Sequence, residues 1–331
     1  MDALVWLGPE QLRMEQLAGP EPAPGEVVVR VDAAGICGSE VEGYLGRQAN
    51  RTPPLVMGHE FAGTVRSVGD GVDPSWTGRR VTVNPLLSCG ACGPCRGGHR
   101  NVCERRQLVG VHRPGGFATE VAVPASTLVS LPDGLDARLA ALAEPLANGV
   151  HAVRLGTLRG SPERAIVIGA GTIGLAALQA ARVAGIAHVA VAEPHPGRRR
   201  QAEALGATET AASADDISDG APLVIDAVGR TETRARGIAL ARPAGTFVAI
   251  GLHTDALALS VHDLIRREIA IQGSYAYSDE DFATALRWLA EGRAGIGPLE
   301  PVRPLSDGPR AFAELAKGAT DAIKIVIAGT A

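Results

Sequence analysis

The first third of the chain consists of short β-branched runs separated by turn residues. Such runs lie at residues 26–31 (EVVVRV), 61–68 (FAGTVRSV) and 79–83, and Pro-Gly steps punctuate the segments between them. β-Branched residues in short runs favour strands, and few stretches here have the spacing of an amphipathic helix. We therefore expect an antiparallel, barrel-like β domain at this end of the chain.

From residue 164 onward, short apolar runs alternate with helical stretches. The predicted strands are 165–168, 188–192, 223–226, 247–250 and 269–272. Helices are predicted at 172–184, which ends before Gly185, and after the second strand as far as Leu205, before Gly206. This alternation predicts a parallel sheet built from βαβ units. Beyond it we expect an amphipathic helix at 279–291 and a last strand at 324–327.

Composition excludes several classes of protein. The chain has 331 residues, enough for two domains, with 46% hydrophobic residues, 21% charged residues and a formal net charge of −4. These values argue against a polybasic nucleic-acid or membrane-surface protein, and 3% aromatic residues argue against a base-stacking platform. The first residues carry no basic region of a signal peptide, and the most apolar segment, 165–192, is interrupted by glycines and Arg182. We expect a cytoplasmic protein that binds neither nucleic acid nor membrane.

A glycine-rich loop joins the first predicted strand of the βαβ region to a helix. Gly169, Gly171 and Gly174 have the spacing of a dinucleotide-binding loop, and Glu193 follows nineteen residues after the last of them. A carboxylate at that position accepts hydrogen bonds from the ribose hydroxyls of NAD and repels the 2′-phosphate of NADP. Arg198–Arg200 could instead hold a phosphate, or form only a solvated helix turn. NAD is the expected cofactor, with NADP as the alternative.

Four of the five cysteines lie within fifteen residues of one another. Cys89, Cys92, Cys95 and Cys103 supply the four thiolates that a closed, structural zinc site requires. A four-cysteine iron–sulfur cluster has the same donors, so spacing alone leaves it open. A tight CxxCxxC cluster in a long chain indicates metal binding rather than disulfides.

A second set of donors is scattered along the chain. Cys37 lies in GICGSE, His59 and Glu60 lie in GHE, and Glu144 begins EPLA. Singly, Cys37 has an ordinary explanation as a small buried residue, and His59 as a hydrogen-bonded core histidine. Together they offer the mixed S, N and O donors of catalytic zinc, which keeps one position open for water or substrate.

The order GICGSE, GHE, CxxCxxCx₇C, EPLA and GAGTIG resembles the zinc-dependent medium-chain alcohol dehydrogenases over essentially the whole chain. The resemblance is strongest to the polyol branch, the sorbitol and galactitol-1-phosphate dehydrogenases. It implies an α/β protein in which a doubly wound Rossmann domain (146–274) carries the dinucleotide. A β-rich, barrel-like (GroES-like) zinc-binding catalytic domain would comprise residues 1–145 and 275–331, with the active site in the cleft.

The resemblance also implies roles around the catalytic zinc. It would be surrounded by Cys37, His59, Glu60 and Glu144, with the two glutamates bound directly or through water. As a Lewis acid, zinc makes deprotonation of an alcohol accessible near neutral pH, and hydride then passes to the nicotinamide.

Three further positions near Cys37 matter to this comparison. Ser39 matches the family's relay hydroxyl, and Glu42 stands where many members have the next relay histidine. Glu40 stands where the family commonly has aspartate, and its carboxylate would orient His59 without binding the metal.

Around the cofactor, Arg198 resembles the basic residue that contacts the adenosine ribose. Residues 226–229 and 250–252 match loops that border the nicotinamide, and the backbone of 273–276 resembles the segment that meets its carboxamide. The implied cofactor residues are Gly169, Gly171, Thr172, Ile173, Gly174, Glu193, Arg198, Val228, Gly251 and Ser274.

The sequence thus predicts an enzyme with two zinc ions per chain that moves hydride between NAD(H) and a secondary alcohol of a polyol or sugar-derived compound. Alternatives are a reductase of a biosynthetic cyclitol or aminocyclitol ketone and, in another class, a non-catalytic zinc-braced nucleotide sensor. A phosphorylated substrate would call for basic residues near the site, such as Arg47 or Arg51, which are equally compatible with a solvated loop. Family members pair their nucleotide-binding sheets, so a homodimer or homotetramer is expected.

Overall fold

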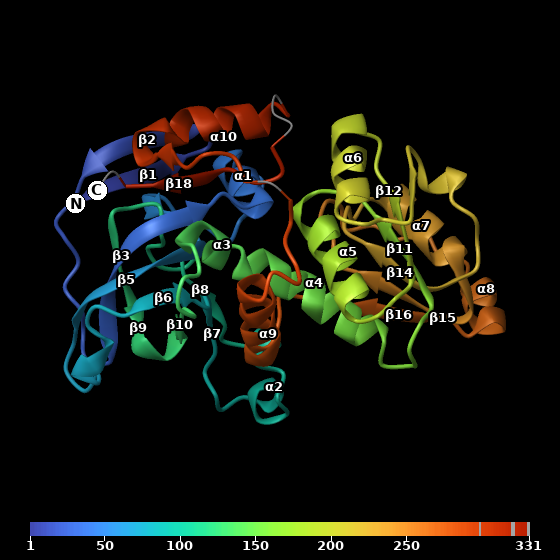
Figure 1. Cartoon of the computed structure of the whole chain (residues 1–331), viewed down its shortest axis with the longest axis horizontal. Coiled ribbons are helices and arrows are strands. Elements are labelled where there is room, and N and C mark those ends of the chain that lie inside the picture. Colours follow the sequence, from blue (N-terminus) through green and yellow to red (C-terminus); the bar gives the residue numbers. More distant parts are fainter. Residues whose placement is uncertain (298, 319–321, 330–331) are drawn as a thin grey trace. The chain divides into compact units, whose positions relative to one another are not determined.

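The chain folds into two units. The computed structural model describes residues 1–297, 299–318 and 322–329. One unit is Met1–Glu144 with Pro298–Ala331, and the other is Pro145–Gly297 (Figure 1). We describe each unit by itself.

The first unit contains a seven-stranded sheet with the order β10-β6-β5-β3-β18-β17, with β9 paired to β3. The strands of this sheet are β3 (Glu26–Gly35), β5 (Glu60–Val68), β6 (Arg80–Val83), β9 (Glu120–Pro124), β10 (Leu128–Ser130), β17 (Arg303–Pro304) and β18 (Val326–Ala328). The three strands predicted in the first third of the chain correspond to β3, β5 and β6. The last strand pairs antiparallel with β3, so the C-terminal segment completes this sheet.

Several elements of the first unit were not predicted. They are the strands β9, β10 and β17 given above, together with β1 (Asp2–Gly8), β2 (Gln11–Gln16), α1 (Gly38–Tyr44), β4 (Leu55–Val56), β7 (Leu86–Leu87), α2 (Gly93–Arg96), β8 (Gln107–Leu108), α3 (Ala137–Ala141) and α10 (Gly308–Ala316). Most are too short for a periodic pattern, and contacts distant in sequence stabilise them instead. The ring of Phe312, on α10, lies 5.5 Å from that of Tyr44 and 5.7 Å from that of Phe117. These rings anchor the C-terminal helix to the core of the unit.

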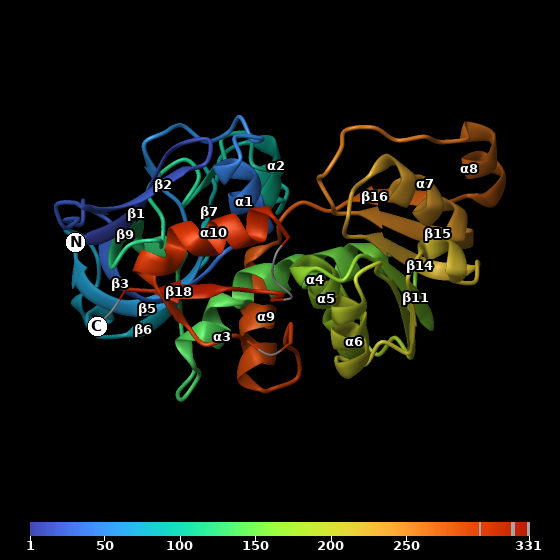
Figure 2. The same ribbon diagram turned by 90° about the horizontal axis from the view of Figure 1, so that it is seen from above.

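The second unit is a six-stranded parallel sheet with the order β13-β12-β11-β14-β15-β16. Its strands are β11 (Arg164–Ile168), β12 (His188–Ala192), β13 (Glu209–Ala211), β14 (Ala221–Asp226), β15 (Ala241–Ala249) and β16 (Ala270–Gly273). Its helices are α4 (Ala143–Gly156), which begins in the first unit, α5 (Thr172–Val183), α6 (Pro196–Ala204), α7 (Thr231–Leu240), α8 (Val261–Arg267) and α9 (Asp279–Ala290). Helices α5 and α6 cover one face of the sheet, and α7 and α8 the other (Figures 1 and 2). This is the doubly wound Rossmann arrangement that the sequence predicts.

The boundary at residue 275 differs from the division that the structure gives. Helix α9 lies in the second unit rather than the first. The reason is a buried ion cluster, in which Asp281 of α9 lies 2.7 Å from Nδ1 of His151 and 2.8 Å from Nε of Arg154, both on α4. This cluster, with the apolar face of α9, ties the helix to α4.

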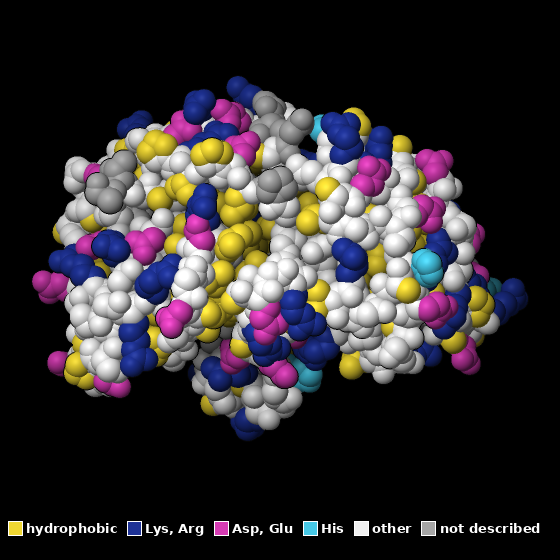
Figure 3. Space-filling model, in the orientation of Figure 1, with side chains coloured by type: hydrophobic (Ala, Val, Ile, Leu, Met, Phe, Trp, Pro, Cys, Tyr) yellow, Lys and Arg dark blue, Asp and Glu magenta, His cyan; other side chains and the backbone are white. Residues whose placement is uncertain are grey.

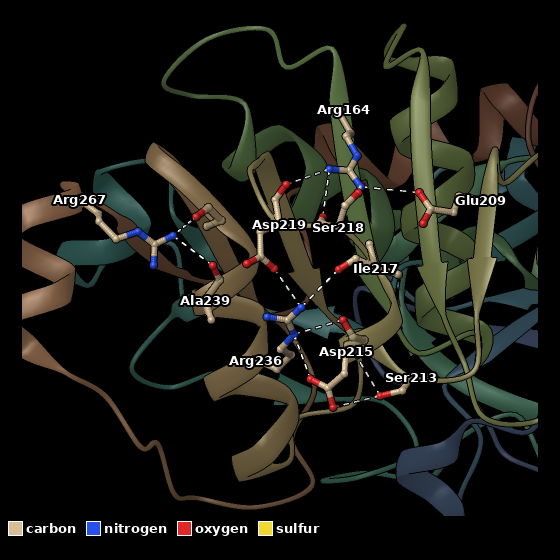
Figure 4. A network of polar contacts seen from close by, with 12 residues as sticks. Arg164, Glu209, Ser213, Asp215, Ile217, Ser218, Asp219, Arg236, Ala239 and Arg267 are labelled. Atoms are coloured by element: carbon tan, nitrogen blue, oxygen red, sulfur yellow. Dashed lines mark hydrogen bonds and ion pairs between the residues drawn. The ribbon is translucent and has the colours of Figure 1, made fainter.

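Arginines tie the loops of the second unit to its sheet (Figure 4). Arg236 of α7 donates to the backbone oxygen of Ile217 and pairs with Asp215 and Asp219. Arg164 at the start of β11 donates to Ser218. Because these bonds lie at the end of the sheet where β11 begins, they leave the carboxyl ends of the strands, where ligands bind in such sheets, untouched.

The surface agrees with the charge balance of the sequence. On the face drawn in Figure 3, side chains of both charges are interspersed over each unit. Among the described helices, none has the length and apolar composition needed to cross a membrane.

Candidate functional site

Four sulfur atoms converge in the loop between β7 and β8, which pair and hold its ends together. The Sγ atoms of Cys89, Cys92, Cys95 and Cys103 all lie within 4.8 Å of one another. The Sγ of Cys92 is 3.4 Å from that of Cys95 and 3.8 Å from that of Cys103. Zn–S bonds of about 2.3 Å in a tetrahedron place sulfurs roughly 3.8 Å apart. The observed spacing therefore fits one tetrahedral ion.

The thiols of this cluster differ in acidity. Backbone N–H groups of Ala91 and Cys92 lower the pKa of Cys89 to about 5. Desolvation and the bond to Cys92 raise the pKa of Cys95 to about 11. Four thiolates this close repel one another, and a divalent cation would offset that repulsion.

Cys37, His59 and Glu60 form the second group of donors. Their ligand atoms lie within 4.8 Å of one another although Cys37 and His59 are 22 residues apart. Cys37 caps the N-terminus of α1, directly after β3, and Glu60 begins β5, where it pairs with Gly35 of β3. The pairing of β3 with β5 therefore creates the group. A thiol, an imidazole and a carboxylate are a donor set that catalytic zinc uses.

Glu40 makes the contact with His59 that the sequence predicts. Its Oε1 is 2.7 Å from His59 Nδ1 and accepts the backbone N–H of His59, and its Oε2 accepts the N–H of Cys37. Burial raises the pKa of Glu40, but the charge of His59 and these hydrogen bonds outweigh it and lower the pKa. An Nδ1–H bonded to an ionised Glu40 leaves Nε2 of His59 free to bind a metal.

Glu60 has a partner that sequence reasoning missed. The Nζ of Lys324 lies 2.8 Å from its Oε1 and 2.6 Å from its Oε2, and it also donates to the carbonyl of Ile36. Burial lowers the pKa of Lys324, but the charge of Glu60 outweighs this and raises it. The available signal was the rarity of lysine, because Lys324 is one of only two in the chain.

Of the other residues predicted for this site, Ser39 contacts the group of Cys37, His59 and Glu60, whereas Glu144 lies outside it. The hydroxyl of Ser39 donates to Cys37 Sγ at 3.4 Å. Glu144 is buried in the first turn of α4, but it is not among the residues whose ligand atoms lie within 4.8 Å of one another. Arg47 is exposed and pairs with Glu42, whereas Arg51 is buried.

The three loop glycines differ in what surrounds them. Gly169 has φ +94°, the left-handed region that favours glycine. A Cβ on Gly174 would overlap the carbonyl oxygen of Gly169, whereas a Cβ on Gly171 would meet no atom within 4 Å. Gly174 therefore allows close packing of α5 against the loop, and Gly171 leaves open backbone for a pyrophosphate. Thr172 and Ile173 form the first turn of α5, whose N–H groups can bind phosphate.

Glu193 lies directly after β12 and is buried. Its Oε2 accepts the N–H of Ala170 in the glycine loop, and its Oε1 accepts that of His195. Arg198 is half-buried in the first turn of α6, while Arg199 donates to the carbonyls of Glu193 and Pro194. The carboxylate is therefore fixed beside the phosphate loop.

The loops predicted to border the nicotinamide follow β14, β15 and β16. Val228 donates its N–H to Asp226. A Cβ on Gly251 would lie only 2.3 Å from backbone atoms of Val228 and Gly229, so the two loops pack too tightly for a side chain there. The buried hydroxyl of Ser274 has no hydrogen-bond partner among the described residues. A buried polar atom left unpaired in the protein fits a loop that a bound cofactor completes.

A Rossmann sheet with a phosphate loop, together with a four-cysteine site and a Cys-His-Glu group in a β domain, defines a zinc-binding dehydrogenase. Residues 23–133 match the alcohol dehydrogenase GroES-like domain, and residues 172–291 match the zinc-binding dehydrogenase family. The chain belongs to the zinc-dependent medium-chain alcohol dehydrogenases, and it is an enzyme of that family.

Two curated relatives act on sugar acids by name. L-galactonate-5-dehydrogenase of Escherichia coli is 34% identical over 303 residues, which is 88% of each chain. The 2-dehydro-3-deoxy-L-galactonate 5-dehydrogenase of Pseudoalteromonas atlantica is 32% identical over 326 residues, or 95% of each chain.

Solved structures share the whole fold. An alcohol dehydrogenase from E. coli CFT073 complexed with NADH has a TM-score of 0.92 and 28% identity, covering 99% of both chains. A zinc-binding dehydrogenase from Sinorhizobium meliloti bound to NADP has a TM-score of 0.91 and 30% identity, covering 99% of this chain and 98% of that one. Galactitol-1-phosphate dehydrogenase from E. coli has a TM-score of 0.89 and 27% identity, covering 99% of both chains.

Proposed function

We propose that this enzyme oxidises a secondary alcohol of a polyol or sugar-derived compound, passing hydride to NAD, or catalyses the reverse reduction. The observation that carries the proposal is the Cys37, His59 and Glu60 group, with ligand atoms within 4.8 Å of one another. A donor set with a carboxylate in place of a second cysteine is the feature that favours polyols over simple primary alcohols. The relatives named for L-galactonate and galactitol-1-phosphate support the same substrate class.

Each of the two donor groups holds one zinc ion in this proposal. Cys89, Cys92, Cys95 and Cys103 hold a structural ion that has no open position for substrate. Cys37, His59 and Glu60 hold the catalytic ion, with Glu144 binding directly or through water. When bound, that ion supplies Lewis-acid polarisation of the substrate oxygen.

The chain's own side chains then control the proton. Glu40 keeps the proton of His59 on Nδ1 through their 2.7 Å contact. In this proposal Ser39, whose hydroxyl lies beside Cys37 Sγ, accepts the proton that leaves the substrate hydroxyl. Glu42, which pairs with Arg47 at 3.3 Å, stands where many family members have the next relay histidine.

NAD is the preferred cofactor in this proposal because Glu193 is a buried carboxylate beside the phosphate loop. A 2′-phosphate there would be repelled by its charge. Glu193→Ala should therefore narrow the preference for NAD over NADP, read from kcat/KM with each cofactor. An unchanged ratio would show that Glu193 does not select the cofactor.

The decisive experiment is an NAD-coupled screen of polyols, sugar acids, sugar phosphates and cyclitols on the purified enzyme, repeated with Cys37→Ala. We expect Cys37→Ala to abolish turnover while NADH binding, followed by fluorescence, is retained, because Cys37 lies in the other unit from the phosphate loop. Full activity in this variant would disprove the catalytic assignment. Metal analysis of the wild type should give two zinc ions per chain.

The enzyme is a homodimer or homotetramer in this proposal, with β16 as the pairing edge. Strand β16 is the last in its sheet, and Ile271 on it and Ile265 on the neighbouring α8 are exposed. An exposed apolar edge strand is a site for pairing with another chain. Light scattering of the wild type and Ile271→Glu tests this pairing.

We place the enzyme in the cytoplasm, in line with its five cysteines, none of which forms a disulfide.

A further inference from the structure

The strand order of the second unit divides the carboxyl edge of its sheet into two halves. In the order β13-β12-β11-β14-β15-β16, the direction of connection reverses between β11 and β14. Sheets with this order bind a dinucleotide across the point of reversal. The glycine loop follows β11 and Glu193 follows β12, so the adenosine half of the cofactor is expected over these strands. The nicotinamide half is then expected over the loops that follow β14 and β15.

The loops after β14 and β15 are joined to each other by backbone hydrogen bonds. The carbonyl oxygen of Asp226, the last residue of β14, accepts the N–H groups of Ile250 and Gly251. The carbonyl oxygen of Gly229 accepts the N–H of Thr254 at 2.9 Å. A Cβ on Gly229 would lie 2.2 Å from the backbone of Gly251, so the two loops touch without room for a side chain between them. They therefore form one continuous backbone surface at this edge of the sheet.

Arg234 of α7 holds the loop after β15 from one end to the other. Its Nη1 donates to the carbonyl oxygens of Thr254 at 2.6 Å and Ala256 at 2.9 Å, and its Nη2 donates to that of Gly251 at 3.1 Å. The loop is otherwise open to solvent, because residues 252–258 are all exposed. A loop with few buried side chains is ordered mainly by its polar contacts, so these three hydrogen bonds contribute much of its order.

We propose that Arg234 is a positioning residue for the nicotinamide half of the cofactor, and that it acts by fixing the loop 251–256 before the cofactor binds. This inference rests on the proposed use of NAD by the enzyme. A binding site that includes a loose loop loses affinity to the cost of ordering that loop, and a loop already held in place avoids this cost. Arg234 touches neither half of the cofactor in this proposal, and the adenosine half does not depend on it.

Two ligands test this role: NADH, and ADP, which keeps the adenosine half and the pyrophosphate but lacks the nicotinamide half. In Arg234→Gln the dissociation constant of NADH should rise by roughly 10-fold, as expected when charge-assisted hydrogen bonds that order a loop are lost, and that of ADP should change by less than about twofold. Arg234→Lys should fall between the wild type and Arg234→Gln, because lysine keeps the charge and loses the planar fork. Calorimetric titration of the whole enzyme measures these constants.

A second arginine of the same helix provides a matched control. Arg236 is half-buried like Arg234, but it binds at the opposite edge of the sheet, where it pairs with Asp215 and Asp219. Both Arg234→Gln and Arg236→Gln remove polar contacts of α7, so both should lower Tm. Arg236→Gln should nevertheless bind NADH and ADP as tightly as the wild type does, which separates positioning of the loop from general stability.

Three results would overturn the proposal: unchanged NADH affinity in Arg234→Gln, an equal loss of affinity for NADH and ADP, or the same NADH-specific loss in Arg236→Gln. A wild type that binds NADH no more tightly than ADP would overturn it as well, because the nicotinamide half would then gain nothing from these loops. None of these titrations needs a substrate. If the enzyme oxidises no polyol or sugar derivative, the proposed function fails for that class, and the titrations still decide the role of Arg234.

Discussion

Lys324 and Glu60 form a buried ion pair, with Nζ 2.6 Å from Oε2, although 264 residues separate them in sequence. Lys324 lies just before β18, and β18 pairs with β3 beside β5, where Glu60 begins. The same lysine donates to the carbonyl of Ile36, the residue before Cys37. The C-terminal segment therefore stabilises the backbone and the carboxylate of the candidate catalytic site.

In the metal-free protein, Lys324→Met should lower the free energy of unfolding by about 3–5 kcal/mol, because it leaves the carboxylate of Glu60 buried and unpaired. Urea unfolding measures this change. Lys317→Met, at an exposed position, is the control and should have little effect. Adding Glu60→Gln to Lys324→Met should recover part of the loss, and failure to recover any would show that the pair does not account for it.

Two glycine substitutions in the phosphate loop should have different effects. Gly171→Ala adds a methyl group in open space where the pyrophosphate approaches, so it should weaken NADH binding and leave Tm unchanged. Gly174→Ala drives a methyl group into the carbonyl oxygen of Gly169, so it should lower both Tm and NADH affinity. Fluorescence titration and thermal unfolding measure the two effects. Equal Tm values for the two variants would contradict this distinction.

Cys103→Ser should remove one zinc ion per chain and lower Tm, because a structural ion contributes its binding energy to folding. Metal analysis and thermal unfolding measure both changes. Cys37→Ala, which removes a ligand of the other site, should also lose one ion but with a smaller change in Tm. Retention of the full zinc content by Cys103→Ser would argue against a four-cysteine zinc site.

Asp281 should make the stability of the second unit depend on pH. Burial raises the pKa of Asp281, but hydrogen bonds from His151, Arg154 and Ser278 outweigh burial and hold the pKa well below the ordinary 3.8. A depressed pKa contributes stability that is present above pH 4 and lost as the pH falls below it.

Asp281→Asn should therefore cost about 2 kcal/mol at pH 7, and the difference from wild type should shrink below pH 4. Urea midpoints between pH 3 and 7 measure it. Glu280→Gln, exposed on the same helix, should follow the wild type at every pH. A difference that is constant with pH would mean that the ionisation of Asp281 is not responsible.

Local patterns predicted most strands of the second unit, although α4, β13, α7 and α8 were not predicted. The predicted strands at 165–168 and 188–192 and the helix at 172–184 match β11, β12 and α5 to within one residue, because each element carries its own periodicity and glycine stop signals. The first unit was harder to predict. Its hairpin β1–β2 and helices α1 and α10 are short, and they depend on rings and strands brought from elsewhere in the chain.

The sequence by itself determined the fold class, the dinucleotide loop and the four-cysteine site, because the donors and glycines of each lie within a few residues of one another. It also indicated Cys37, His59 and Glu60 through their family motifs. Only the tertiary structure decided that Lys324 pairs with Glu60, that Asp281 ties α9 to α4, and that Arg234 binds three carbonyl oxygens of the loop after β15. These relationships depend on strand pairing and on burial, and both are set by contacts between residues far apart in the chain.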